Sequence, residues 1–150
     1  MPLAAQILAV LAALIHVYFF YLESIAWTKP STWKVFGLGS QDEADVTKSL
    51  ALNQGFYNLF LAIGVIVGVG LVGTAEGTTV AAFGEPEDSV LAAAPDFNSF
   101  FWGQAFVTFG LACMLGAALV LLISSKGKMA RGAAIQGLLP AVALLIIAFA

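Results

Sequence analysis

Residues 49–75 have the sequence SLALNQGFYNLFLAIGVIVGVGLVGTA, which contains no charged side chain. A helix needs roughly 20 predominantly apolar residues to cross the hydrocarbon core of a bilayer. Three more uncharged stretches of comparable length surround this one, at residues 1–22, 97–125 and 132–150. The sequence therefore predicts an all-α polytopic membrane protein built as a bundle of four transmembrane helices.

The composition of the whole chain supports the same class. Hydrophobic residues make up 61% of the chain and charged residues 10%, whereas soluble domains have roughly 25% charged residues. The net charge is -3, and the six Lys and Arg residues form no basic surface for phosphates, which argues against nucleic acid as a partner. The loops are too short to bury a core of their own, so we expect one domain, residues 1–150.

The predicted spans have recognisable ends. The Lys29-Pro30 pair ends the first span, because the residue before a proline disfavours helical geometry. Ser40 and Glu43 have the spacing of a capping box, which predicts a helix that begins near Gln41 and continues into the second span. The spans are expected over residues 3–27, 50–73, 98–124 and 133–149, with an acidic loop over residues 74–97.

The basic residues predict the orientation. All of them lie within residues 28–48 and 126–131, and loops rich in Lys and Arg stay in the cytoplasm. We therefore expect an N-out/C-out multi-pass protein of the cytoplasmic membrane, with the acidic loop outside and the lipid bilayer as its surroundings. Aromatic residues near the span ends are typical of a membrane-interface belt, with stacking against a ligand as the alternative role: Trp27, Trp33, Phe36 and Trp102.

Polar side chains within the spans are costly in hydrocarbon and therefore mark candidate sites. His16 and Glu23 lie seven positions apart, close to two helical turns, and are expected to share one face. They are the candidate catalytic residues, as an acid/base pair or a proton relay. Further polar residues fall in the same predicted cytoplasmic half and are candidate ligand-binding residues: Asn53, Gln54, Tyr57, Asn58 and Gln136. Together they predict a polar pocket that opens toward the cytoplasm.

A purely structural explanation stays open for these residues. Asn, Gln and His commonly form interhelical hydrogen bonds, each contributing roughly 0.5–2 kcal/mol. Glu23 could extend to water or pair with Lys29 or Lys34. One His and one intramembrane carboxylate are too few for a stable metal site, so no metal and no cofactor are predicted. Cys113 is expected to act as a small hydrophobic side chain.

Several short motifs in the first half of the chain resemble a known family. They are His16, Tyr21-Leu22-Glu23, Trp27-Thr28, Lys34-Val35-Phe36-Gly37-Leu38 and Asn53-Gln54-Gly55-Phe56-Tyr57-Asn58. The pattern resembles the family labelled domain of unknown function 1304, a group of small four-span membrane proteins. This resemblance implies the four-helix fold and points to the Asn-Gln-Gly block, but it implies no substrate. The loop at residues 74–97 is longer and more acidic than the family pattern.

Three functions fit these observations. The first is an intramembrane pocket for a small amphipathic or lipid-like molecule, whether or not a reaction follows. The second is an accessory subunit of a larger membrane complex, which would pack against partner helices through Gly64, Gly68, Gly110 and Gly116. The third is a proton or solute transporter, which would need an oligomer to form a pore.

Overall fold

The computed structural model describes residues 1–84 and 97–150, with side chains over residues 1–75 and 97–150. Its elements are α1 (Leu3–Phe20), the π-helical turn η1 (Tyr21–Ile25), α2 (Pro30–Trp33), α3 (Gln41–Gly84), α5 (Phe97–Ser124) and α6 (Ala130–Phe149). In the described ranges, four helical segments are long and apolar enough to cross a membrane. The predicted all-α membrane fold with four spanning helices is confirmed.

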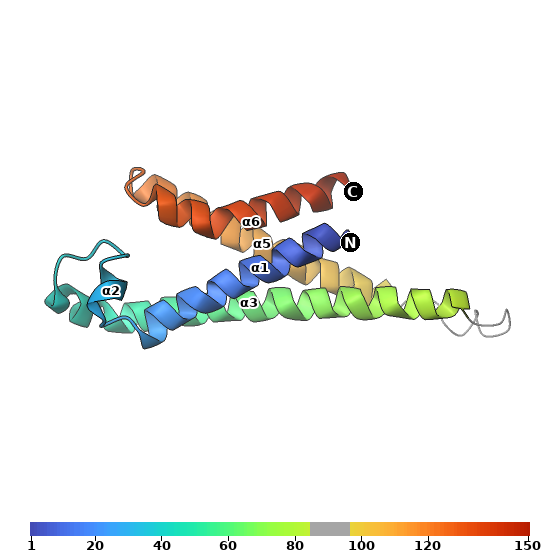
Figure 1. Cartoon of the computed structure of the whole chain (residues 1–150), viewed down its shortest axis with the longest axis horizontal. Coiled ribbons are helices and arrows are strands. Elements are labelled where there is room, and N and C mark those ends of the chain that lie inside the picture. Colours follow the sequence, from blue (N-terminus) through green and yellow to red (C-terminus); the bar gives the residue numbers. More distant parts are fainter. Residues whose placement is uncertain (85–96) are drawn as a thin grey trace.

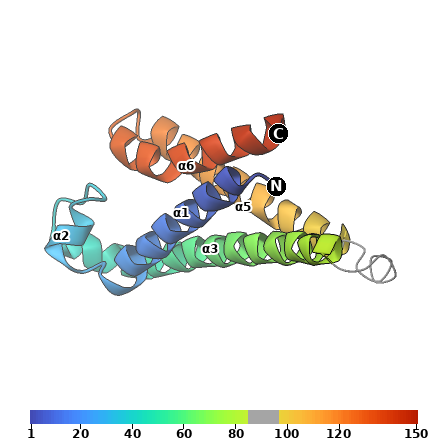
Figure 2. The same ribbon diagram turned by 45° about the vertical axis from the view of Figure 1, so that its right-hand side comes forward.

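The four long helices pack as a ring. Helix α1 contacts α3 and α6, and α5 contacts the same two helices, while α1 and α5 barely touch. Figures 1 and 2 show that α1 and α5 run in one direction and α3 and α6 in the other, so both chain termini lie at one end of the bundle. The opposite end carries α2 and the turn between α5 and α6. We call it the basic end, because it contains all Lys and Arg residues.

Helix α3 begins as the capping box predicted but ends later than expected. The Glu43 backbone N–H donates to Ser40 Oγ at 3.2 Å, and the Gly39 N–H donates to Glu43 Oε2 at 2.8 Å. The helix starts at Gln41 and continues without a break to Gly84. The prediction that a loop starts at Thr74 is therefore wrong for residues 74–84, which are helical. Glycines in this segment do not end the helix, because an internal glycine costs a helix only about 1 kcal/mol. The rest of that loop, residues 85–96, lies outside the described residues.

Small residues allow the helices to approach one another closely. A Cβ atom on Gly68 would lie 2.8 Å from the backbone oxygen of Gly103, so α3 and α5 are almost in backbone contact there. A Cβ on Gly110 would lie 2.5 Å from Val65 Cγ2, whereas Gly64 and Gly116 have nothing within 4 Å. Gly68 and Gly110, two of the glycines expected to pack against partner helices, thus pack against helices of the same chain.

Two tryptophans at the basic end are buried in protein and do not face lipid. Trp27 and Trp33 form a small cluster with Ala44 and Ala51, and Trp27 Nε1 donates to the backbone oxygen of Ala44 at 2.9 Å. The segment after η1 folds back over the first turns of α3, where alanines leave room for the indole rings. The interface-belt prediction was wrong for these two residues. Trp102 is 56% exposed, as a lipid-facing side chain would be.

Candidate functional site

The centre of the site is the π-helical turn that follows α1. The Ala26 N–H donates to the Tyr21 backbone oxygen at 2.9 Å, a bond that spans five residues and widens the helix. Glu23 lies in the middle of this turn. Wide turns of this kind occur as single-turn insertions in α-helices, frequently at functional sites. The sequence showed the glutamate, but nothing in the sequence indicated the change in helix geometry.

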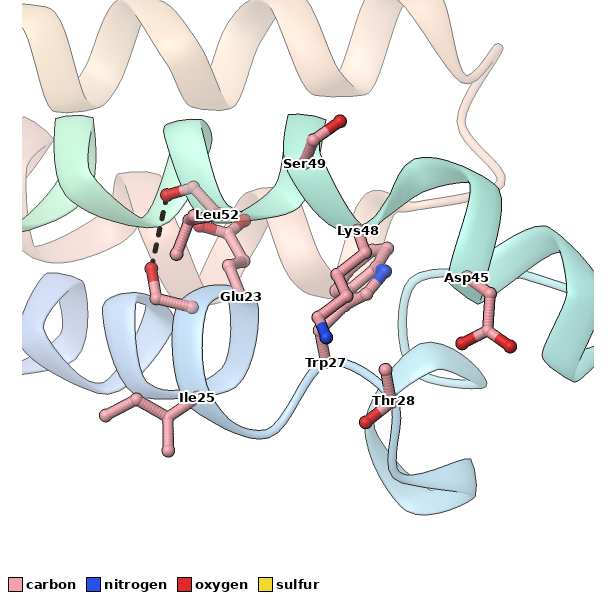
Figure 3. Close-up of a pocket in the computed structure, with 9 residues that line it drawn as sticks. Glu23, Ile25, Trp27, Thr28, Asp45, Lys48, Ser49 and Leu52 are labelled. Carbon is pink, nitrogen blue, oxygen red and sulfur yellow. Dashed lines mark hydrogen bonds between the residues drawn. The ribbon is translucent and has the colours of Figure 1, made fainter.

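A glycine of α3 allows this turn to pack closely. A Cβ on Gly55 would overlap Ser24 Oγ and would lie 3.2 Å from both Glu23 Cβ and the Phe20 backbone oxygen. Ser24 Oγ donates to the Leu52 backbone oxygen at 3.2 Å, the dashed line in Figure 3. The glycine of the Asn-Gln-Gly block therefore has a packing role, because it lets α3 lie directly against η1.

One hydrogen bond ties the candidate acid to the Asn-Gln-Gly block. Asn58 Nδ2 donates to Glu23 Oε2 at 2.7 Å, and both side chains are partly buried. The cations considered as partners of Glu23 lie elsewhere, since Lys29 is placed over the Tyr21 ring and Lys34 over the Trp33 ring. An amide that donates to a carboxylate is a comparatively strong hydrogen bond, so it holds the Glu23 side chain in a defined position.

This pair borders a cavity of about 710 Å³ at the basic end of the ring, which we call the bundle cavity. Residues from all four long helices line it, together with η1, the segment after α2 and the turn between α5 and α6. Its polar lining consists of Glu23, Gln54, Tyr57, Asn58, Lys128, Arg131 and Gln136. Its apolar lining includes Phe19, Leu22, Val35, Phe36, Leu61, Leu121, Met129 and Ile135.

Most of the residues predicted from sequence meet in this cavity. Glu23, Gln54, Tyr57, Asn58 and Gln136 come together from η1, α3 and α6. Asn53 is exposed and is not part of this lining. The helical spacing explains the difference, because Gln54, Tyr57 and Asn58 lie three or four positions apart on one stripe of α3, whereas Asn53 is displaced from it.

His16 lies in the interior of the bundle and not in the cavity wall. Its side chain is fully buried, and its Nδ1 donates to the Ala12 backbone oxygen at 2.9 Å, one turn earlier in the same helix. Phe19 meets the imidazole edge to face, with 5.7 Å between the ring centroids. Within the described part of the chain, Nε2 has no hydrogen-bond partner. An acid/base pair of His16 and Glu23 stays a prediction.

Two basic residues of the cavity were not among the predicted site residues. In the sequence, Lys128 and Arg131 indicate only how the chain is oriented in the membrane. The chain turns sharply between α5 and α6, where Lys126 and Gly127 have φ values of 50° and 80°. This reversal places Lys128 and Arg131 in the cavity wall. Only the tertiary structure relates these cations to the Asn-Gln-Gly block.

The fold and the cavity together define a small helical membrane protein with a polar and apolar pocket at one end of its bundle. The chain belongs to the family described as "Protein of unknown function (DUF1304)", whose profile matches residues 10–87 and 88–148. The resemblance seen in the sequence is thereby confirmed. The family description assigns no activity, so the function has to be argued from the cavity.

One curated relative shares part of this sequence. It is the "Uncharacterized protein YpaA" of Lactococcus lactis subsp. lactis (strain IL1403), which is 34% identical over 70 residues. The aligned region covers 46% of this chain and 59% of the relative, so the match spans less than two thirds of that protein. No solved structure matches the chain.

Proposed function

We propose that this protein binds a small amphipathic or lipid-like molecule in the bundle cavity, and that the cavity opens toward the cytoplasm. The observation that carries this proposal is the composition of the cavity wall. Amide, hydroxyl and charged groups from three parts of the chain converge beside an apolar wall formed by the same bundle. Ligand sites commonly have 300–1,000 Å³ and combine an apolar lining with a few polar groups, and a volume of about 710 Å³ lies within that range.

The polar groups favour a head group that both donates and accepts hydrogen bonds. Gln54 and Gln136 each offer an amide donor and an amide acceptor, and Tyr57 offers a hydroxyl group. Lys128 and Arg131 add positive charge to the same wall, which favours a carboxylate or phosphate on the ligand. An acyl or isoprenoid-like chain would contact Phe19, Leu61, Leu121 and the other apolar residues.

The location of the cavity supports entry from the membrane and from the cytoplasm. The cavity lies at the basic end, where Lys128 and Arg131 line it. Basic loops are retained on the cytoplasmic side, so the polar part of a ligand would face that compartment. The protein would then be a multi-pass component of the cytoplasmic membrane.

Proton transfer to a bound head group would fall first to Glu23. It is the one carboxylate among the residues that line the cavity, and Asn58 orients it. A positioned carboxyl group within hydrogen-bond reach of a ligand is a general acid or base. His16 is fully buried in α1, the helix that precedes η1. It would take part through a ligand or a water molecule that reaches its Nε2 atom.

Native mass spectrometry of delipidated protein in a mild detergent tests the proposal. The probes are oleic acid and 1-monooleoylglycerol, with hexadecane as a purely apolar comparison. We expect one molecule of either amphiphile per chain and no hexadecane, because only the amphiphiles satisfy the polar wall. Asn58→Ala and Gln136→Ala should each weaken binding about fivefold, the effect of losing roughly 1 kcal/mol of hydrogen bonding.

The matched control is Gln104→Ala, which removes a partly buried amide that does not line the cavity. It should leave binding of both amphiphiles unchanged. The proposal fails if neither amphiphile binds, or if the two cavity variants bind as tightly as the control.

A further inference from the structure

A second hollow lies next to the bundle cavity, and Glu23 lines both of them. It has a volume of about 540 Å³ and lies between the end of η1 and the first turns of α3 (Figure 3). We call it the boundary pocket. Its lining combines charged, polar and apolar side chains: Glu23, Ser24, Ile25, Trp27, Thr28, Asp45, Lys48, Ser49 and Leu52.

The pocket holds charges of both signs. Glu23 and Asp45 supply two carboxylates, and Lys48 supplies one ammonium group. In the view of Figure 3, Lys48 lies between the two acidic residues. Across the residues that the structure describes, Lys48 forms no hydrogen bond or ion pair, so its charge is available to a ligand. A ligand that matches this lining carries both a cation and an anion.

The position along the chain places this pocket where lipid head groups lie. The charged residues in the first turns of α3 end at Lys48, and the uncharged run begins at Ser49. On the membrane side of this boundary, Ile25 is 63% exposed and Leu52 is 45% exposed, as is typical of side chains that face acyl chains. A molecule with its head in the pocket would therefore have its apolar part beside these two residues.

We propose that the boundary pocket binds the head group of a phospholipid that carries a primary ammonium, as phosphatidylethanolamine does. The ammonium donates to the carboxylate of Asp45, and the phosphate accepts from Lys48, which lies one helical turn further along α3. Charge-assisted hydrogen bonds of this kind are roughly twice as strong as neutral ones. A quaternary ammonium cannot donate to carboxylates and is usually bound by several aromatic rings, whereas this lining has the single ring of Trp27.

The proposal does not depend on the bundle cavity, and its test uses different probes. Delipidated full-length protein is titrated with dioleoyl forms of phosphatidylethanolamine, phosphatidylglycerol and phosphatidylcholine, and bound lipid is measured by native mass spectrometry. We expect phosphatidylethanolamine to bind most tightly. Asp45→Asn and Lys48→Gln should each weaken it about tenfold, as expected for the loss of one charge-assisted hydrogen bond.

Asp42→Asn and Lys34→Gln are the matched controls, because they make the same charge changes at exposed positions outside the pocket. Both should bind phosphatidylethanolamine like the unaltered protein. Circular dichroism checks that all four variants fold, which exposed substitutions rarely prevent. Equal binding of the three lipids, or an Asp45→Asn effect no larger than that of Asp42→Asn, overturns the proposal. Soluble phosphoethanolamine that binds as tightly as the lipid would also overturn it, because the acyl chains would then contribute nothing.

Discussion

Asn58 and Glu23 lie 35 positions apart in the chain and are joined by a hydrogen bond of 2.7 Å. The bond connects the middle of the π-helical turn to the stripe of α3 that carries Gln54 and Tyr57. Glu23 lines the bundle cavity on one side and the boundary pocket on the other. The orientation of this carboxylate therefore affects the bundle cavity, and the bond from Asn58 holds that orientation.

The coupling between these two residues is measurable. Asn58→Ala should lower the free energy of unfolding by about 1–2 kcal/mol, since it leaves a partly buried carboxylate without its donor. Glu23→Gln keeps an oxygen that accepts from Asn58 and should lower it less than Glu23→Ala does. A double-mutant cycle of the two alanine variants, measured by denaturant titration in mixed micelles, should give a coupling energy of about 0.5–2 kcal/mol. Additive effects would show that the bond does not stabilise the folded state.

Gly55→Ala tests the close packing of η1 on α3. The added methyl group would overlap Ser24 Oγ and press on the Phe20 backbone oxygen, so the turn would have to move and the bond from Ser24 to Leu52 would weaken. We expect a loss of about 1–3 kcal/mol in unfolding free energy, the usual cost of overpacking. Gly70→Ala is the control, because nothing lies within 4 Å of an added Cβ there. Equal stability of the two variants would contradict this packing.

Gly64 and Gly68 lie one turn apart on α3 and should respond differently to substitution by alanine, because only Gly68 packs against α5. Gly68→Ala would place a methyl group 2.8 Å from the backbone oxygen of Gly103 and 2.9 Å from Phe106 Cβ, so the two helices would have to separate. At Gly64 the added methyl group meets open space. Thermal unfolding in detergent should show a clear decrease in melting temperature for Gly68→Ala and little change for Gly64→Ala. A similar decrease in both would mean that Gly64 also lies at an interface, for example with a partner helix.

His16→Leu should not destabilise the protein. The imidazole donates only within its own helix, and its Nε2 is buried without a partner in the described structure. A buried polar atom that lacks a hydrogen bond costs about 1–3 kcal/mol, and leucine removes that cost with a similar volume. We expect an equal or higher melting temperature. A marked decrease would indicate that Nε2 has a partner in the membrane, such as a bound ligand or water, and would favour the functional interpretation of His16.

The orientation in the membrane is a separate prediction. Both termini lie at the end opposite to the basic loops (Figure 1), so the positive-inside rule predicts that both face outward. A reporter that is active only outside the cytoplasm, fused after Ala150, should be active. The same reporter inserted at Gly127, in the turn between α5 and α6, should be inactive. The reversed pattern would place the bundle cavity on the outer side and would contradict the cytoplasmic opening.

The amino-acid sequence was sufficient to predict an all-α membrane fold and most of the polar residues that line the bundle cavity. Long uncharged stretches such as residues 49–75 leave few alternatives to spanning helices, because unsatisfied backbone groups cannot be tolerated in hydrocarbon. The spacing of Gln54, Tyr57 and Asn58 also places them on one stripe of a helix, whatever the neighbouring helices do. These properties are local, and a one-dimensional pattern is sufficient to show them.

Which of these polar residues come together depends on how the helices pack. The π-helical turn, the fit of Gly55 against it and the arrival of Lys128 and Arg131 at the cavity depend on how the helices pack in a ring. His16 and Glu23 share a predicted face, yet one is enclosed within the bundle and the other borders two hollows. Contacts between distant segments are set by the shapes of the facing surfaces, and such shapes have no periodic signal in the sequence.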